Sequence, residues 1–360
     1  MDIGVMQAGF DVLACIEIDR YACETLRAAV ARERRETHII EADIREIDPY
    51  ALMRRLKVDS GELDLLCGGP PCQAFSQIGK QHSLNDERGM LLFEMTRFAE
   101  AFRPKAIMIE QVKGMLTARD ERGIRGGVFQ QLVGILRQLG YQPRTQILLA
   151  ADYGVPQMRE RVFVVALANE DLDFEFPEPT HRKPGELIGL HLPPYRTVGE
   201  ALKDLTHPVP KVKGQQPSDS HMDVSTDGDR RRINGVPEGA WLSSQRHLPA
   251  DQLCNLTRKD TTKFRRLSNR EPSLTLRCGE IFFHPSENRI LTPREYMRIH
   301  GYPDDYQLKG PIKSRSGRVR HLDQHRQVAN SVPPPVARVV AEQIKKSLEC
   351  HKSSRSLAFA

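Results

Sequence analysis

The chain has 360 residues, of which 39% are hydrophobic, and carries a formal net charge of +6. This length allows one large α/β domain and a smaller second domain, each with its own core. No apolar run is long enough to span a bilayer, and the first residues lack the basic-then-apolar layout of a secretory signal. We therefore expect no membrane protein, and a chain that stays in a reducing cytosol. The positive charge is compatible with a polyanionic partner.

The cysteine pattern argues against both a disulfide framework and a metal site. The seven cysteines are scattered and odd in number, which fits a reducing compartment. Cys67 and Cys72 lie close together, but they lack the paired CxxC clusters of a structural zinc site and no histidine group completes them. We expect no bound metal.

The first 170 residues alternate short apolar runs with helical patterns. The expected strands are 11–19, 38–44, 63–69, 105–112, 145–153 and 161–168, and the expected helices are 21–33, 49–56, 91–102 and 129–140. This alternation predicts an α/β fold with a doubly wound, mainly parallel sheet. Ligands of such sheets bind beyond the carboxyl ends of the strands. Glu17, Asp43, the turn at 68–72 and Glu110 are all expected at those ends.

The composition changes after about residue 170, where proline and polar residues become frequent and periodicity weakens. We expect a first domain at 1–169, a smaller loop-rich domain at 170–264, a return to the first domain at 265–350 and a frayed tail at 351–360. Cations concentrate in this second half of the chain, at 230–232 and 257–270. Either run taken alone is also compatible with an ordinary solvated surface.

The segment that points most clearly to chemistry is LLCGGPPCQAFSQIG, at 65–79. Its Gly-Gly-Pro-Pro turn follows a buried strand and projects the next side chain, Cys72, into the crevice at the sheet edge. Because proline fixes the backbone, the thiol is held in a rigid loop. A cysteine fixed in such a place is a candidate nucleophile.

Six segments, in this order along the chain, resemble the motif blocks of the DNA cytosine-C5 methyltransferases, the S-adenosylmethionine-dependent enzymes of bacterial restriction-modification systems. The segments are LLCGGPPCQAFSQIG, IEQVKGM, DYGVPQMRERVFVV, FRRLSNREPSLTLR, RIHGYPDDY and QVANSVPPPVA. The resemblance runs from about residue 5 to about residue 345. It implies the sheet of the S-adenosylmethionine-dependent methyltransferases, with the loop-rich domain as the target-recognition domain.

The resemblance also implies how the catalytic residues act on a cytosine. Cys72 would add as a thiolate to C6 of a base flipped out of duplex DNA, which makes C5 nucleophilic. Glu110 would hydrogen-bond or protonate ring N3, and burial should raise its pKa for that purpose. Arg159 and Arg161 would orient the base and hold Glu110. Water is one option for the base that removes the C5 proton.

The methyl donor would be S-adenosylmethionine. A carboxylate such as Glu17, at a strand end, can accept both ribose hydroxyls. Asp43 would bind the adenine amino group, and Ile18 would pack on the ring. By resemblance, the remaining residues of the donor site are Ile44, Pro71, Asn330 and Ser331.

The target-recognition domain would read bases in the major groove of duplex DNA while cations neutralise phosphates. The residues expected to contact DNA are Ser76, Gln157, Arg265 and Arg266, with Trp241 and Arg246 as further candidates. The chain is expected to act as a monomer. A cognate restriction endonuclease that acts on the same site is a possible partner.

The sequence departs from the family pattern at its beginning. Residues 1–10 resemble the stretch that directly follows the family's Phe-x-Gly-x-Gly-Gly loop, so the first strand and that loop are absent. We expect unpaired backbone and a defective donor site as a result, and a start displaced downstream or a truncated gene. A second departure is Gln111, where the family has asparagine.

Two alternatives keep part of this interpretation. A tRNA cytosine-C5 methyltransferase would use the same chemistry on another polymer, although the substantial variable region favours DNA. A truncated, inactive DNA-binding remnant would explain the missing loop. A cysteine hydrolase is disfavoured because no histidine is paired with Cys72 in the sequence, the nearest being His82 in a polar loop.

Overall fold

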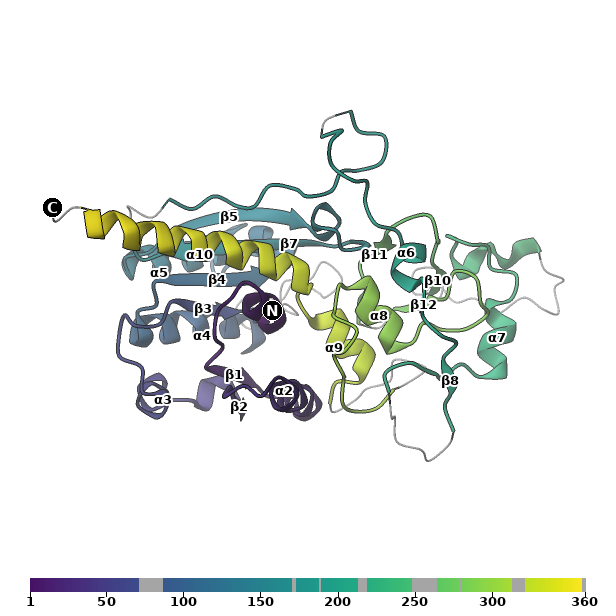
Figure 1. Cartoon of the computed structure of the whole chain (residues 1–360), viewed down its shortest axis with the longest axis horizontal. Coiled ribbons are helices and arrows are strands. Elements are labelled where there is room, and N and C mark those ends of the chain that lie inside the picture. Colours follow the sequence, from purple (N-terminus) through teal and green to yellow (C-terminus); the bar gives the residue numbers. More distant parts are fainter. Residues whose placement is uncertain are drawn as a thin grey trace.

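The computed structural model describes residues 1–70, 87–169, 173–187, 189–212, 219–247, 264–278, 280–312 and 321–357 (Figure 1). The predicted site residues Pro71, Cys72 and Ser76 lie outside the described residues, as does His82. None of the helices in the described part combines the length and the hydropathy that crossing a bilayer requires.

The fold is α/β, and its largest sheet has four strands in the order β3-β4-β7-β5. These strands are β3 (Leu65–Gly68), β4 (Ala106–Gln111), β7 (Glu160–Leu167) and β5 (Gln142–Leu149). The β3–β4 pair is parallel, whereas β7 runs antiparallel to both β4 and β5. A separate parallel pair joins β1 (Ala14–Glu17) to β2 (His38–Glu41).

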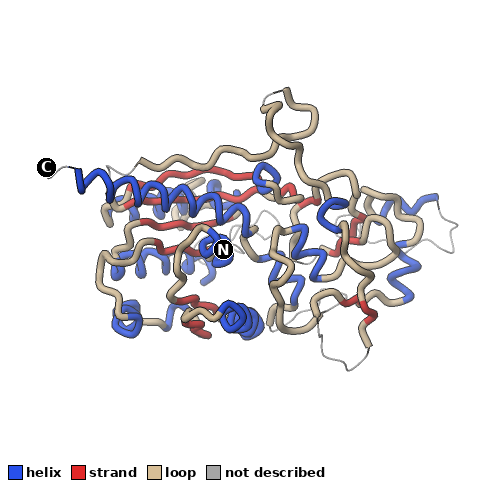
Figure 2. The backbone as a smooth tube through the Cα atoms, viewed as in Figure 1, coloured by secondary structure: helices blue, strands red, loops and turns tan. Residues whose placement is uncertain are grey.

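Helices cover both faces of the four-stranded sheet (Figure 2). Because side chains alternate along a strand, Ala106 and Met108 pack with helix α10 (Pro334–Leu357) on one face. Ile107 and Ile109 pack on the other face against helices α4 (Glu87–Phe102) and α5 (Gly127–Gln138). All six residues of β4 are buried, so this strand is the centre of the core.

The sequence predicts the elements of the first 170 residues well, with differences at their ends. Helix α2 (Arg20–Glu33) begins after Asp19, whose side chain accepts from the backbone N–H of Ala22. Helix α3 (Pro49–Leu56) has the expected bounds, with Asp48 as its cap and proline at its first position. A short helix, α1 (Asp2–Gln7), precedes these elements. Three 3-10 turns lie between them: η1 (Ile44–Glu46), η2 (Lys113–Thr117) and η3 (Ala150–Tyr153). The strand expected at 145–153 therefore ends at Leu149.

The elements from residue 157 onward, other than β7 and α10, are short. They are β6 (Gln157–Met158), α6 (Val198–Leu202), β8 (Val209–Pro210), β9 (Met222–Asp223), α7 (Asp227–Ile233), η4 (Leu242–His247), β10 (Phe264–Arg266), β11 (Ser273–Leu274), β12 (Ile281–Phe283), α8 (Pro293–Ile299) and α9 (Gln324–Asn330). Thr197, Thr226 and Thr292 each form a capping box at the start of a helix. Helix α10 extends to Leu357, and no glycine or proline follows Pro335 within it.

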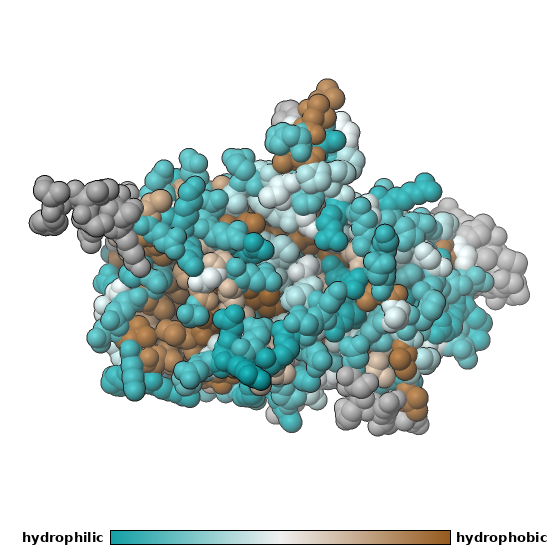
Figure 3. Space-filling view, in the orientation of Figure 1, coloured by the Kyte–Doolittle hydropathy of each residue, from teal (hydrophilic) through white to brown (hydrophobic). Residues whose placement is uncertain are grey.

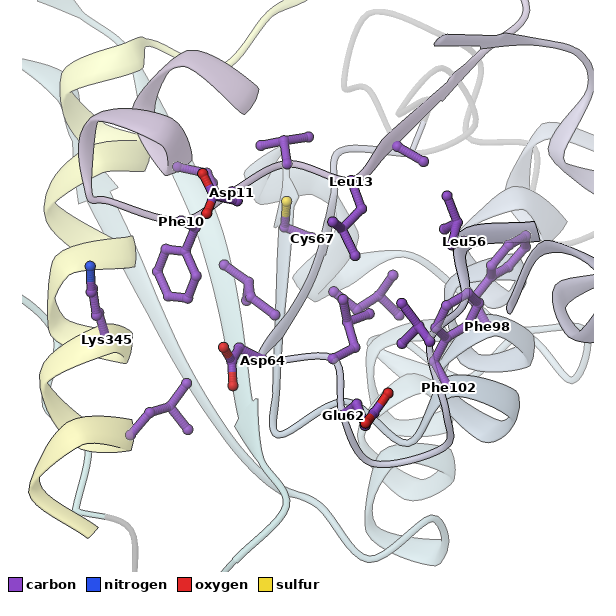
Figure 4. Close-up of a pocket in the computed structure, with 18 of the residues that line it drawn as sticks. Phe10, Asp11, Leu13, Leu56, Glu62, Asp64, Cys67, Phe98, Phe102 and Lys345 are labelled. Carbon is purple, nitrogen blue, oxygen red and sulfur yellow. The ribbon is translucent and has the colours of Figure 1, made fainter. Parts of the chain in front are cut away.

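A slot separates the β1–β2 pair from the four-stranded sheet, between strands β1 and β3. Strand β1 is paired only with β2, and β3 is the last strand of the larger sheet, so each leaves one edge open among the described strands. A cavity of about 470 Å³ lies between them, lined by apolar side chains that include Ile16, Leu65 and Phe98 (Figure 4). Hydrophobic atoms also gather on the surface between α10 and α3 (Figure 3).

Candidate active site

The site is built around the carboxyl end of β4, where Glu110 faces the turn that follows β3. A Cβ atom added at Gly69 would lie 3.1 Å from Glu110 Oε2, so a larger residue here would crowd the carboxylate by a few tenths of an ångström. Glu110 is 8% exposed, whereas Gly69 lies at the surface. The carboxyl group therefore lies directly beneath the turn that leads to Cys72.

Glu110 forms a buried ion pair with Arg161, with 2.8 Å between Oε1 and the arginine Nε. Burial raises the pKa of Glu110, while the charges of Arg161 and Arg159 act in the opposite direction. The predicted increase in pKa is thus confirmed in direction, and desolvation is its largest cause. A carboxyl group of this kind can hold a proton nearer neutral pH than an exposed one.

Gln111, the residue that departs from the family pattern, ties β4 to the same turn. Its Nε2 donates to the carbonyl oxygen of Pro70 at 2.8 Å, and its Oε1 accepts from the backbone N–H of Val112 at 3.1 Å. The glutamine therefore supplies a hydrogen bond that holds the turn after β3 to the end of β4.

Arg159 is 2% exposed and binds the backbone of the C-terminal half. Its guanidinium donates to the carbonyl oxygens of Leu276, Ala329 and Ser331 at 3.0 to 3.1 Å. Arg161 forms the ion pair with Glu110, whereas these bonds of Arg159 run to backbone carbonyls, so the two arginines have different roles. Arg159 joins the catalytic sheet to the segments that surround the site.

The residues expected to hold the methyl donor lie at the ends of β1 and β2. Burial raises the pKa of Glu17, whose Oε1 accepts from the backbone N–H of Asp19 at 2.8 Å. Ile18, next to Glu17, is 64% exposed. The Asp43 carboxylate accepts from Arg45 at 2.6 Å, which lowers its pKa, and it caps the turn that contains Ile44. An exposed apolar side chain next to Glu17 can pack against an aromatic ring.

Asn330 and Ser331 lie at the end of α9, on the segment that Arg159 holds. Asn330 is exposed, and its Oδ1 accepts from the thiol of Cys278 at 2.8 Å. The next residue, Val332, is buried and would lie 3.8 Å from a Cβ atom at Gly69. The structure thus brings the 330–332 segment to the Gly69–Glu110 end of the sheet.

The predicted DNA contacts occupy different environments. Gln157 has no exposed surface, since its amide is held inside the protein by Leu276 and His300. Arg266 also points inward and donates to the Ile233 carbonyl at 3.3 Å, and burial lowers its pKa. Arg265 instead stacks over the ring of Trp241, with 5.1 Å from its guanidinium carbon to the ring centroid. The side chain of Arg246 is not among those described.

The described cysteines near the sheet are poor nucleophiles. Burial raises the pKa of Cys67 to about 11, so its thiol is protonated at neutral pH. Within the described residues, no cluster of three or more potential metal ligands is present.

Two residues of this region were missed in the sequence. Gln111 was noted only as a departure, and its contact with Pro70 depends on how β3 and β4 pair. His300 lies within RIHGYPDDY, where a single histidine in a helical pattern gives no functional signal. It is fully buried beside Gln157 and Ser331.

The model of the C-5 cytosine-specific DNA methylase family matches residues 1–346 of the chain. The chain belongs to this family. It is a DNA (cytosine-5-)-methyltransferase, which transfers a methyl group from S-adenosylmethionine to C5 of cytosine in DNA, as type II modification methyltransferases do.

Curated relatives and a solved structure agree with the assignment of this methyltransferase to the family. Type II methyltransferase M.NgoFVII of Neisseria gonorrhoeae is 32% identical, over 93% of this chain and 80% of the relative. Type II methyltransferase M.NgoMIV of the same organism is 33% identical, over 96% of this chain and 94% of the relative. A putative DNA modification methyltransferase from an Escherichia coli prophage has the same fold, with a TM-score of 0.67 and 21% identity over 96% of this chain and 95% of that one.

Replacing Arg161 with methionine removes the cation beside buried Glu110, so the pKa of Glu110 should rise further. Ionised Glu110 then lacks its partner, and the free energy of unfolding at pH 8 should fall by about 3 kcal/mol. The folded-state pKa lies above the unfolded value, so ionisation costs stability as pH rises from about 4.5. The deficit should therefore shrink towards pH 5.

Urea unfolding at pH 5 and pH 8 measures this difference, with Arg161→Lys as the variant that keeps the charge. An equal loss of stability at both pH values would show that the arginine acts through packing alone.

Proposed function

We propose that this methyltransferase acts on a cytosine flipped out of a specific duplex DNA sequence, through a covalent bond between Cys72 and ring C6. The observation that carries the proposal is the desolvated carboxyl group of Glu110, paired with Arg161 and lying against Gly69. Cys72 follows Gly69 by three positions in the sequence. A proton donor and a nucleophile would thus reach the same base from neighbouring strands.

The chemistry needs both groups because cytosine C5 is a weak nucleophile. When the Cys72 thiolate adds to C6, the electron pair of the C5–C6 bond moves through the ring towards N3. A proton from Glu110 at N3 would neutralise this charge, while Arg161 fixes the carboxyl group in place. C5 can then attack the methyl group that S-adenosylmethionine supplies. Removal of the C5 proton and departure of the Cys72 sulfur restore the aromatic ring.

We assign the donor site to the carboxyl ends of β1 and β2 and to the end of α9. Glu17 would accept the ribose hydroxyls, and Ile18 would pack against the adenine ring, which its exposure allows. Further contacts would come from Asp43, Ile44, Pro71, Asn330 and Ser331.

DNA recognition is assigned to the loop-rich part between α6 and β12, in the expected domain at 170–264 and just beyond it. Arg265, which stacks on Trp241, is our first candidate for a contact with DNA. Ser76 is kept as a second candidate. We also propose that the protein acts as a monomer in the bacterial cytoplasm, alongside a cognate restriction endonuclease that acts on the same site.

We further propose that the two sheets are parts of one doubly wound sheet, interrupted at the slot. Parallel pairing of β1 with β2 and of β3 with β4, together with the apolar lining of the slot, supports this view. The acidic residues Glu62 and Asp64 lie at its rim. The occupant that fits is one extended apolar segment, parallel to β1 and β3, with a cation at its amino end.

A lysine-led peptide of alternating valine and threonine should therefore bind in the slot as a strand. The carbonyls of Leu13 and Glu17 accept from His38 in β2 and from Ala42 just after it, so the amides of Ala14 and Ile16 point to the open edge. The peptide should slow hydrogen exchange at these two amides by about tenfold. The control is the same peptide with N-methyl groups on alternate residues, because it keeps the side chains and loses backbone N–H donors. Equal protection by both peptides, or by neither, would refute strand addition.

Replacing Glu110 with glutamine tests the catalytic proposal. The amide keeps the shape but has no acidic proton for N3, so kcat should fall at least about 100-fold. Incorporation of tritiated methyl groups into duplex DNA and tRNA, measured side by side, gives the rate and the preferred polymer. Glu100→Gln on the exposed side of α4 is the matched control and should keep full activity.

Wild-type kcat in Glu110→Gln would remove Glu110 from the mechanism. A preference for tRNA would replace the DNA assignment with the alternative substrate.

A further inference from the structure

His300 connects the arginine-bearing segment to the segment that ends α9. It is the C-terminal cap of α8 and has no exposed surface. Its Nδ1 lies 3.0 Å from Nε2 of Gln157, and its Nε2 lies 3.1 Å from the carbonyl oxygen of Ser331. Both ring nitrogens are therefore used inside the protein.

The direction of these hydrogen bonds follows from the backbone groups at the two ends. The backbone N–H of Leu276 can only donate, so the side-chain atom of Gln157 that faces it at 3.2 Å is the oxygen. The amide nitrogen of Gln157 then faces His300, whose Nδ1 must accept. At the other end the Ser331 carbonyl can only accept, so His300 Nε2 carries the proton.

The charges around the ring favour the same neutral form. Burial lowers the pKa of His300 well below its ordinary value, and Arg159, Arg161 and the N-terminal amino group add to the effect. A second ring proton would also place two N–H donors against each other at Gln157.

The Ser331 carbonyl is the point at which this chain of hydrogen bonds reaches the candidate site. It accepts from His300 and also from Arg159 Nη2 at 3.0 Å. Asn330 precedes it at the surface, and buried Val332 follows it against the Gly69 turn. A shift of this one carbonyl would therefore move the segment assigned to the donor site.

We propose that His300 is a positioning residue, which uses its Nε2 proton to fix the Asn330–Val332 segment for methyl-donor binding. This proposal rests on the assignment of Asn330 and Ser331 to the donor site. The histidine touches neither donor nor base, so its loss should weaken donor binding more than it slows the chemical step.

A matched pair of substitutions separates the two nitrogens. In His300→Gln the side-chain amide nitrogen can take the place of Nε2 and still donate to Ser331. In His300→Asn the side-chain oxygen can take the place of Nδ1 and accept from Gln157, but no donor reaches Ser331. Each variant keeps one hydrogen bond and loses the other, so similar melting temperatures are expected.

The KM for S-adenosylmethionine should rise about tenfold in His300→Asn and stay within about threefold of wild type in His300→Gln. The kcat should change by less than about threefold in both. Equal KM values in the two variants, or a fall in kcat without a change in KM, would overturn the positioning role.

The tautomer can be measured without any assay of activity. The ¹⁵N chemical shifts of His300 should show a neutral ring protonated at Nε2 across pH 6 to 8, as the lowered pKa requires. A ring protonated at Nδ1, or at both nitrogens, would contradict the proposal even if a variant failed to fold. If the wild type transfers no methyl group while the Nε2 tautomer is observed, the failure lies in the proposed function and not in the geometry around His300.

Discussion

The buried ion pair between Glu110 and Arg161 is the constraint around which the rest of the site is arranged. Burial raises the pKa of this carboxyl group, and the charge of Arg161 limits the rise. The ion pair with Arg161 also orients the carboxyl group. Gly69 lets the turn lie close to the carboxylate, since a Cβ atom at this position would be only 3.1 Å from Glu110 Oε2. Gln111 adds a second tie by holding the carbonyl of Pro70. Together these contacts hold the turn after β3 against the carboxyl end of β4.

The same region shows why a single catalytic centre needs both halves of the chain. Arg159, on the catalytic side, holds carbonyl groups of Leu276, Ala329 and Ser331, which lie far along the sequence. Because the guanidinium is buried, these bonds compete with no solvent, and losing them would leave several acceptors unsatisfied. Arg159, which directly precedes β7, therefore ties these C-terminal segments to the sheet. Donor binding and base binding can be coupled through this one side chain.

Sequence reasoning was most reliable where local rules determine structure. Helix α3 begins at Pro49 after its Asp48 cap, as predicted, and Glu110 lies at the end of β4 because buried parallel strands place their last residues at one edge. Sequence reasoning was least reliable where tertiary packing decides which way a side chain points. Gln157 belongs to a recognisable motif, yet whether it faces solvent or His300 depends on segments more than 100 residues away. The slot between β1 and β3 likewise depends on strand order, which no local pattern contains.

The central claim is that sulfur of Cys72 adds to the pyrimidine ring beside Glu110. The most direct measurement uses duplex oligonucleotides in which 5-fluorocytosine replaces cytosine, incubated with the protein and S-adenosylmethionine. Fluorine at C5 prevents release of the enzyme after methyl transfer, so mass spectrometry should find a peptide linked to the base through Cys72, and no adduct in Cys72→Ser. Absence of an adduct in the wild type, or an adduct on another residue, would contradict the account.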